Sequence, residues 1–157
     1  MLQSSQKLLA ATAGLGSLAL LVGAFGFQFI GGLQPCQLCL WQRWPHAAAV
    51  VILLAVLVTG WRGLLWLGAL AALATAAIGV FHVGVEQQWW QGLATCSVNT
   101  LSGVGVADLL DPTKDVAQPV RCDAIAWEMW GVSMAGWNVI LSTVFALMWL
   151  SAARRTA

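Results

Sequence analysis

Charged residues are scarce in this sequence, and their scarcity excludes several classes of protein. The 157 residues include seven Lys or Arg and six Asp or Glu, together 8%, whereas 60% of the chain is hydrophobic. A soluble domain carries roughly 25% charged residues, so we exclude a soluble enzyme, and the high hydrophobic content excludes a disordered chain. The net charge of +1 also excludes a nucleic-acid binder, which needs a strong basic excess. We expect one integral membrane domain over residues 1–157.

Four apolar segments have about the length of a membrane span, because a helix crosses the ~30 Å hydrocarbon core with about 20 residues. These segments are residues 8–30, 40–60, 63–83 and 134–152. They predict an all-α membrane protein, a four-helix transmembrane bundle with a short outer loop at 31–39 and a long one at 84–133. In the long loop, residues 103–110 are apolar but too short to cross, so we expect a short interfacial helix there.

The distribution of charge predicts how the bundle is oriented. Four spans place both termini on one side of the membrane. The segments on that side carry four basic residues and no acid: Lys7, Arg62, Arg154 and Arg155. The outer segments carry three basic residues and all six acids. The positive-inside rule therefore predicts cytoplasmic termini and outer loops on the opposite side.

The aromatic residues are unbalanced, since the sequence has ten Trp and no Tyr. The tryptophans lie near the predicted span ends, with Trp41, Trp44, Trp89, Trp90, Trp127, Trp130 and Trp137 at the outer ends and Trp61, Trp66 and Trp149 at the inner ends. An amphipathic indole favours the headgroup region of a bilayer, so we expect an aromatic belt on each side.

All four cysteines fall in the two outer loops, and none lies within a predicted span. Cys36 and Cys39 form a C-x-x-C in the first loop, and Cys96 and Cys122 lie in the second. Four cysteines allow three pairings. A C-x-x-C bridge closes too small a loop to stabilise a fold much, so we predict a working dithiol/disulfide relay. Two inert bridges remain an alternative, as does a zinc site, although zinc favours two short-spaced pairs.

The residues around the C-x-x-C favour a thiolate at its second cysteine. Pro35 fits the first turn of a helix, which would place Cys39 near the positive end of the helix dipole. Arg43 lies four residues after Cys39, hence on the same helix face, and adds a permanent positive charge. An arginine at this membrane depth needs a partner, and the thiolate or an oxygen of a bound electron acceptor would serve. Snorkelling to the headgroups is the alternative.

The sequence resembles the DsbB family of bacterial inner-membrane proteins in two features. These are the P-C-x-x-C at 35–39 followed by Arg43, and the widely spaced cysteine pair in the second outer loop. Residues 81–86 and 122–138 are also similar to this family, and the resemblance covers essentially the whole chain. It implies a protein-dithiol:quinone oxidoreductase that reoxidises a periplasmic DsbA-like thiol oxidase. The electrons would pass to the membrane quinone pool, and the cysteine loops would be periplasmic.

The resemblance also implies a role for each cysteine. The partner's thiolate would attack Cys96, and Cys122 would then attack Cys36. Cys39, released as a thiolate, would lie against the quinone, with Arg43 stabilising its charge. These five residues are therefore the predicted catalytic residues.

Two histidines and one acid lie near the outer span ends. His82 falls close to a family position beside the quinone, so Cys39, Arg43 and His82 are the predicted quinone-binding residues. We interpret His46 as a satisfied interfacial histidine and Glu86 as a solvated acid at the loop edge.

Thiol exchange conserves disulfides, so making new ones requires an outside electron acceptor. We find no site for nicotinamide, flavin or a metal, since the G-x-G-x-x-A at residues 14–19 lies inside a predicted span with no strand before it. A quinone, either ubiquinone or menaquinone, needs no such motif. The alternatives are a non-catalytic tetraspan scaffold stapled by Cys96–Cys122 and a Cys-ligated metal protein.

Overall fold

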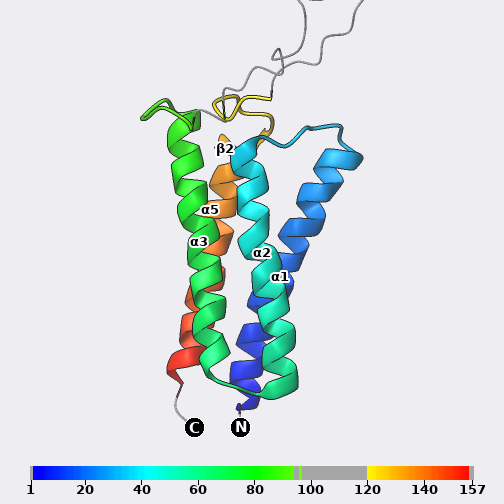
Figure 1. Cartoon of the computed structure of the whole chain (residues 1–157), viewed down its shortest axis with the longest axis vertical. Helices are drawn as coiled ribbons and strands as arrows, with labels where there is room; N and C mark the ends of the chain where they lie inside the picture. Colours follow the sequence, from blue (N-terminus) through cyan, green and yellow to red (C-terminus); the bar gives the residue numbers. More distant parts are fainter. Residues whose placement is uncertain (1, 94–95, 97–119, 156–157) are drawn as a thin grey trace, which may run out of the picture.

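The computed structural model describes residues 2–93, 96 and 120–155 as a bundle of long helices (Figure 1). The helices are α1 (Ser4–Phe29), α2 (Gln37–Thr59), α3 (Gly63–Glu86) and α5 (Met134–Arg154), and a two-stranded antiparallel hairpin, β1 (Glu128–Met129) and β2 (Val132–Ser133), precedes α5. All four helices are long and apolar enough to cross a membrane. The predicted four-helix transmembrane bundle is confirmed. The interfacial helix expected at residues 103–110 lies outside the described residues.

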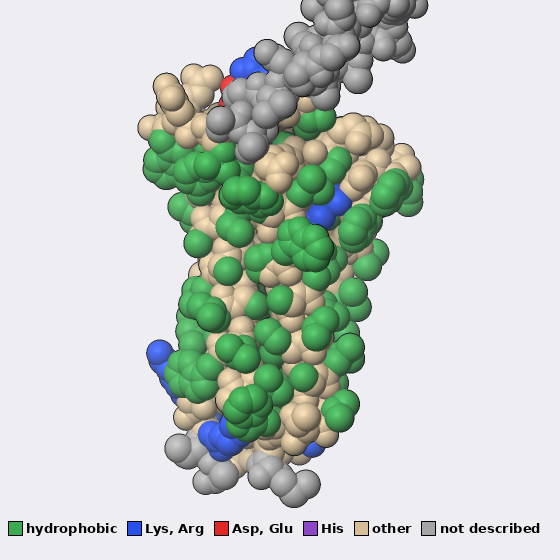
Figure 2. Space-filling view, in the orientation of Figure 1, with side chains coloured by type: hydrophobic (Ala, Val, Ile, Leu, Met, Phe, Trp, Pro, Cys, Tyr) green, Lys and Arg blue, Asp and Glu red, His purple; other side chains and the backbone are tan. Residues whose placement is uncertain are grey.

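The surface of the bundle is that of a membrane protein. Hydrophobic side chains follow the helices along the face seen in Figure 2, and Lys and Arg side chains gather mainly at its lower end. α1 begins and α5 ends at this lower end, whereas α2 begins and α3 ends at the opposite end (Figure 1). Cys36 precedes α2 at that opposite end, and Cys96 and Cys122 pack with it. We call these the terminal half and the cysteine half of the bundle.

Of the helix boundaries that differ from the predictions, two affect the cysteine half. Pro35 was expected in the first turn of α2 but lies outside the helix, because Cys36 is the N-cap: its sulfur accepts a hydrogen bond from the backbone N–H of Cys39 at 3.2 Å. Cys39 is therefore in the first turn. α3 runs to Glu86 rather than to residue 83, which brings that carboxyl group into the bundle.

The terminal half has a tightly packed apolar core. Trp149 is fully buried there, among alanines of α3 and α5, so the prediction that it belongs to the inner aromatic belt is wrong. The reason is Gly68 on α3, where a Cβ atom would lie 2.5 Å from the indole ring. The recess above this glycine admits the ring, and such close approach at small residues is typical of helix packing in membranes.

The short hairpin was not predicted, although its turn has a sequence signal. Trp130 and Gly131 occupy the two turn positions, and both have positive φ, 55° and 74°. Two such residues form the type I′ turn that suits a tight hairpin, and glycine is favoured at the second position. The hairpin fixes the segment before α5 against the ends of α3 and α5.

Candidate functional site

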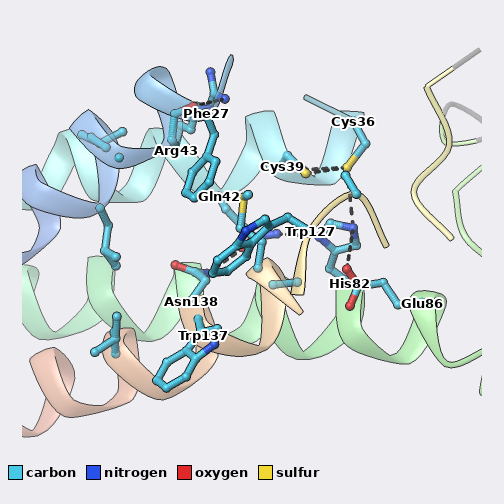
Figure 3. A pocket seen from close by; sticks show the side chains of 18 of the residues that line it. Phe27, Cys36, Cys39, Gln42, Arg43, His82, Glu86, Trp127, Trp137 and Asn138 are labelled. Atoms are coloured by element: carbon cyan, nitrogen blue, oxygen red, sulfur yellow. Dashed lines mark hydrogen bonds and ion pairs between the residues drawn. The ribbon is translucent and has the colours of Figure 1, made fainter. Parts of the chain in front are cut away.

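A cavity of about 550 Å³ lies in the cysteine half, between α1, α2 and α5. α1 diverges from α2 toward this end of the bundle (Figure 1). Most of the cavity wall is apolar. Its polar groups and sulfurs include those of Cys36, Cys39, Gln42, Arg43, His82, Glu86 and Asn138 (Figure 3), and His46 also lines it. An apolar chamber with a few converging polar groups is the usual form of a small-molecule site.

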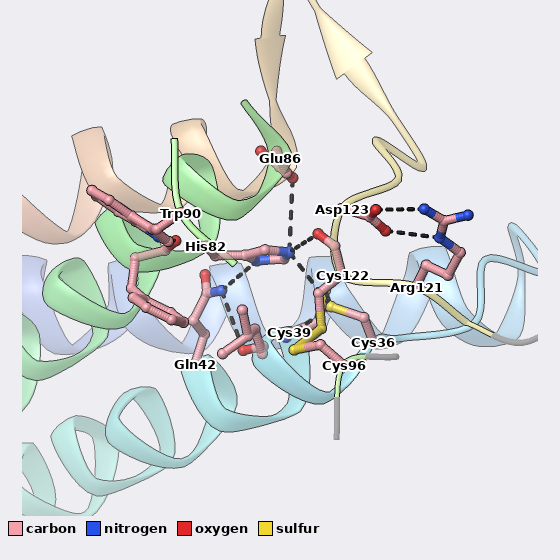
Figure 4. The surroundings of a disulfide bond; sticks show 12 residues. Cys36, Cys39, Gln42, His82, Glu86, Trp90, Cys96, Arg121, Cys122 and Asp123 are labelled. Atoms are coloured by element: carbon pink, nitrogen blue, oxygen red, sulfur yellow. Dashed lines mark hydrogen bonds and ion pairs between the residues drawn. A yellow bond between two sulfur atoms is a disulfide. The ribbon is translucent and has the colours of Figure 1, made fainter. Parts of the chain in front are cut away.

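The two predicted cysteine pairs meet beside this cavity. Cys96 and Cys122 form a disulfide, whereas Cys36 and Cys39 are free thiols with their sulfurs 2.7 Å apart. Cys36, Cys96 and Cys122 belong to one buried cluster (Figure 4). The structure thus brings together all four cysteines from the two loops.

The thiol pair is asymmetric. A hydrogen bond with Cys39 and burial both raise the pKa of the Cys36 thiol well above its ordinary value. This direction favours Cys36 as the protonated member of the pair. Cys39 is also the more accessible sulfur, since Cys36 is only 6% exposed.

Arg43 lines the same cavity but is held by α1. Its guanidinium donates to Oε1 of Gln28 at 2.6 Å and to the backbone carbonyl of Ala24 at 3.3 Å, and it lies 4.8 Å above the ring of Phe25. The arginine thus has protein partners at this depth, as its burial requires. Its predicted role beside the Cys39 thiolate stays a prediction.

His82 contacts both cysteine pairs. The ring is 3% exposed, and Nε2 lies 3.2 Å from the backbone oxygen of Cys122 and 3.5 Å from the sulfur of Cys36 (Figure 4). Its Nδ1 lies 2.9 Å from Nε2 of Gln42. Its predicted contact with a quinone stays a prediction, whereas its contact with the sulfur of Cys36 is direct.

Glu86 is not the solvated acid that we expected. Its side chain is 5% exposed, accepts a hydrogen bond from the Ser133 hydroxyl at 2.5 Å and lies 3.8 Å from Nε2 of His82. The prediction fails because α3 continues one turn further than its hydrophobic run, and the hairpin then covers its last residue.

Buried amides connect the helices of the cysteine half. Asn138 of α5 contacts Oε1 of Gln42 at 2.7 Å and Nε2 of His46 at 2.8 Å. His46 is 4% exposed between α2 and α5, so it is a core residue and not an interfacial one; among the described residues its Nδ1 has no hydrogen-bond partner. Sequence reasoning missed Gln42 and Asn138, although a polar side chain inside a span is itself a signal of function.

The residues that could hold a metal fit one poorly. The sulfurs of Cys36 and Cys39 and a ring nitrogen of His82 lie within 4.8 Å of one another. A ligating histidine normally donates its other N–H to an acceptor. Here the other nitrogen, Nδ1, faces the amide nitrogen of Gln42, which is a donor. A metal bound to Nε2 would leave the ring proton on Nδ1, where this N–H would face the N–H of the Gln42 amide.

Comparisons with known proteins agree on one family. A family model described as "Disulfide bond formation protein DsbB" matches residues 6–152. The chain is 32% identical to "Disulfide bond formation protein B" of Methylococcus capsulatus, over 87% of this chain and 89% of the relative. It is 31% identical to the protein of that name from Aromatoleum aromaticum, over 89% and 92%. No solved structure gives a significant match.

Proposed function

Because this chain belongs to the DsbB family of disulfide-forming thiol oxidases, we propose that it reoxidises a periplasmic DsbA-like dithiol protein and passes the electrons to a membrane quinone. Its termini would lie in the cytoplasm and its cysteines at the periplasmic side of the bacterial inner membrane. One observation carries the proposal: a loop disulfide packs on a thiol pair whose more accessible sulfur lines an intramembrane cavity. An inert scaffold would need only the disulfide.

The four cysteines support a relay that runs from the loop to the cavity. The partner's thiolate would attack Cys96, break the Cys96–Cys122 bond and release Cys122 as a thiolate. Cys122 would then attack Cys36 of an oxidised Cys36–Cys39 pair, so that one disulfide forms as another breaks and Cys39 leaves with the electron pair. The common cluster of Cys36, Cys96 and Cys122 supports this order of contacts.

The cavity supports a quinone as the final acceptor. A bound quinone supplies an acceptor for two electrons and two protons, and ubiquinone and menaquinone both carry such a ring. The volume of about 550 Å³ is within the usual range for small-molecule sites, roughly 300–1,000 Å³. Cys39, Arg43 and His82 line the cavity and are the residues that we propose to contact the ring. Arg43 would donate hydrogen bonds to an oxygen as its charge rises.

An anaerobic assay tests this function. The purified full chain in detergent is mixed with a reduced dithiol partner and a soluble benzoquinone analogue, and quinol is measured. We expect quinol from the wild type and none from Cys39→Ser, which should keep its helix content and its Cys96–Cys122 disulfide. No quinol from the wild type, or equal amounts from both proteins, would favour the scaffold. A bound metal that survives chelation would favour the metal protein.

A further inference from the structure

Two backbone carbonyls fix the orientation of the buried amides in the cysteine half. The backbone oxygen of Leu38 lies 3.2 Å from one side-chain atom of Gln42, and the backbone oxygen of Thr75 lies 3.3 Å from one of Asn138. A carbonyl oxygen can only accept, so these atoms must be the amide nitrogens. The second atom of each amide is therefore its oxygen.

These orientations determine which ring nitrogens of the two histidines carry a proton. Nε2 of Gln42 donates to Nδ1 of His82 at 2.9 Å, so this Nδ1 is an acceptor without a proton. The proton of the neutral ring is then on Nε2. By the same reasoning, Oδ1 of Asn138 faces Nε2 of His46 at 2.8 Å, so His46 also carries its proton on Nε2.

The assigned proton of His82 lies between a backbone oxygen and one sulfur, that of Cys36. Nε2–H donates to the backbone oxygen of Cys122 and lies 3.5 Å from the sulfur of Cys36. Protonation of Nδ1 would place an N–H against the N–H of Gln42 at 2.9 Å, which disfavours an imidazolium. Oε1 of Glu86, the acid that faces the ring, lies 3.8 Å from Nε2, beyond hydrogen-bond distance, and the other oxygen, Oε2, accepts from Ser133. The ring is therefore held as a neutral donor and does not carry protons back and forth.

We infer that His82 is a catalytic hydrogen-bond donor to the sulfur of Cys36 and stabilises Cys36 as a leaving thiolate. Gln42 is the positioning residue that keeps the proton of the His82 ring on Nε2. This inference rests on the proposed function, since it concerns one step of the same relay. Before that step, the second thiolate of the dithiol partner attacks the partner–Cys96 mixed disulfide, so that the partner leaves oxidised and Cys96 is released as a thiolate. The Cys96 thiolate then attacks Cys122 of the Cys36–Cys122 disulfide. The Cys96–Cys122 bond forms, the Cys36–Cys122 bond breaks, and Cys36 leaves with the electron pair. An N–H directed at that sulfur lowers the energy of the charge in a buried site.

Nitrogen NMR on the wild-type chain tests the assignment directly. The sequence has only two histidines, so a ¹⁵N-histidine-labelled sample gives two ring systems, and His46→Gln assigns them. We expect both rings to be neutral at pH 7 with the proton on Nε2. A proton on Nδ1 of His82, or a doubly protonated ring, would overturn the inference.

A pair of variants tests the consequence for Cys36. In Cys39→Ala with Cys96–Cys122 closed, Cys36 is the single free thiol, and its alkylation by iodoacetamide at a fixed alkaline pH reports its thiolate. His82→Gln keeps an N–H donor near the Nε2 position but cannot carry a proton, whereas His82→Leu has neither. We expect alkylation about 10- to 100-fold slower in His82→Leu and within about threefold of the parent in His82→Gln, the range for hydrogen bonds to charged groups.

Equal slowing in both variants would make His82 a proton carrier or a merely structural residue, and no slowing in either would remove it from the relay. Both results overturn the inference. Neither experiment contains quinone or partner protein, so their failure is distinguishable from failure of the proposed function, which the quinol assay measures. Helix content and the intact loop disulfide serve as folding controls for the variants.

Discussion

The terminal half and the cysteine half of the bundle are held together by different kinds of contact. In the terminal half, Trp149 is buried among alanines and against Gly68, with dispersion contacts between closely spaced helices. The buried amide of Gln6 in this half donates to backbone oxygens at the end of α5. In the cysteine half, the buried polar groups are more numerous and include amides, imidazoles and hydroxyls: Gln42, His46, Thr75, His82, Ser133 and Ser142. Polar groups inside a membrane need partners, and most of these contact one another or backbone carbonyls.

The two halves therefore differ in what they contribute: the terminal half supports the stability of the fold, and the cysteine half holds the groups proposed to react. Close packing at small residues needs no polar partner and supports the helices rigidly. The polar half leaves a cavity, two free thiols and, within the described part of the chain, an unpaired ring nitrogen on His46. We expect substitutions in the terminal half to change unfolding and those in the cysteine half to change turnover.

The largest effect should come from the loop disulfide in the cysteine half. Cys122→Ala leaves Cys96 free to capture the reduced partner but removes the thiol that would resolve the complex, so we expect a stable mixed disulfide. Cys96→Ala should capture none. Non-reducing gel electrophoresis after mixing with the dithiol partner measures both. Recovery of no adduct from Cys122→Ala would contradict the assigned order of attack.

The next largest effect should be on stability in the terminal half. Trp149→Ala removes a fully buried ring, and we expect it to lower the free energy of unfolding by about 3–5 kcal/mol. Trp66→Ala is the matched control, because this indole of α3 is 51% exposed. Unfolding in a denaturing detergent, followed by circular dichroism, compares the two. Equal losses of stability in both variants would contradict the role of Trp149 in stabilising the terminal half. A folded but inactive Trp149→Ala in the quinol assay would contradict the division of roles between the two halves.

A smaller effect is expected from the arginine that lines the cavity. Arg43→Ala should raise the quinone KM or slow turnover by about tenfold, the value of roughly one hydrogen bond from a charged group, while the loop disulfide stays intact. Arg62→Ala removes the same charge from the terminal half, where Arg62 donates to the backbone oxygen of Arg155, and should leave quinone kinetics unchanged. Unchanged kinetics in Arg43→Ala would remove it from the proposed quinone site.

The fold was largely predictable from the sequence because a bilayer constrains it strongly. The length of the apolar runs predicted four spans, and the absence of cysteines from those runs predicted that both pairs would meet at one end. Trp149 shows the limit of this reasoning. Its position near a span end predicted the headgroup region, whereas its burial depends on which face of α5 meets Gly68, and hydrophobicity does not determine that rotation.

The site was predictable to a smaller extent, for the same reason. Cys36, Cys39 and Arg43 share one local motif, so their proximity to the cavity follows from one helix. The contacts of Gln42 with His82 and Asn138 join three helices, and no local pattern specifies them. Their amide and imidazole chemistry could still have been noticed, because polar residues in a span require an explanation.

The smallest effect should come from an ion pair outside the helices. Arg121 donates to Asp123 at 2.9 Å and 2.5 Å, and these hydrogen bonds lower the pKa of that carboxyl below its ordinary value. Because the pKa of Asp123 is lower in the folded chain, ionisation of this carboxyl favours the folded state at pH values above the pKa of the unfolded carboxyl, about 3.9. This contribution is lost as the pH falls through the lower pKa of the folded state. Both side chains are largely solvent-screened, so Asp123→Asn should leave unfolding unchanged at pH 7 within error. A clear loss of stability at pH 7 that disappears at pH 3 would show that charge outside the helices supports the cysteine half, against the division drawn between the two halves.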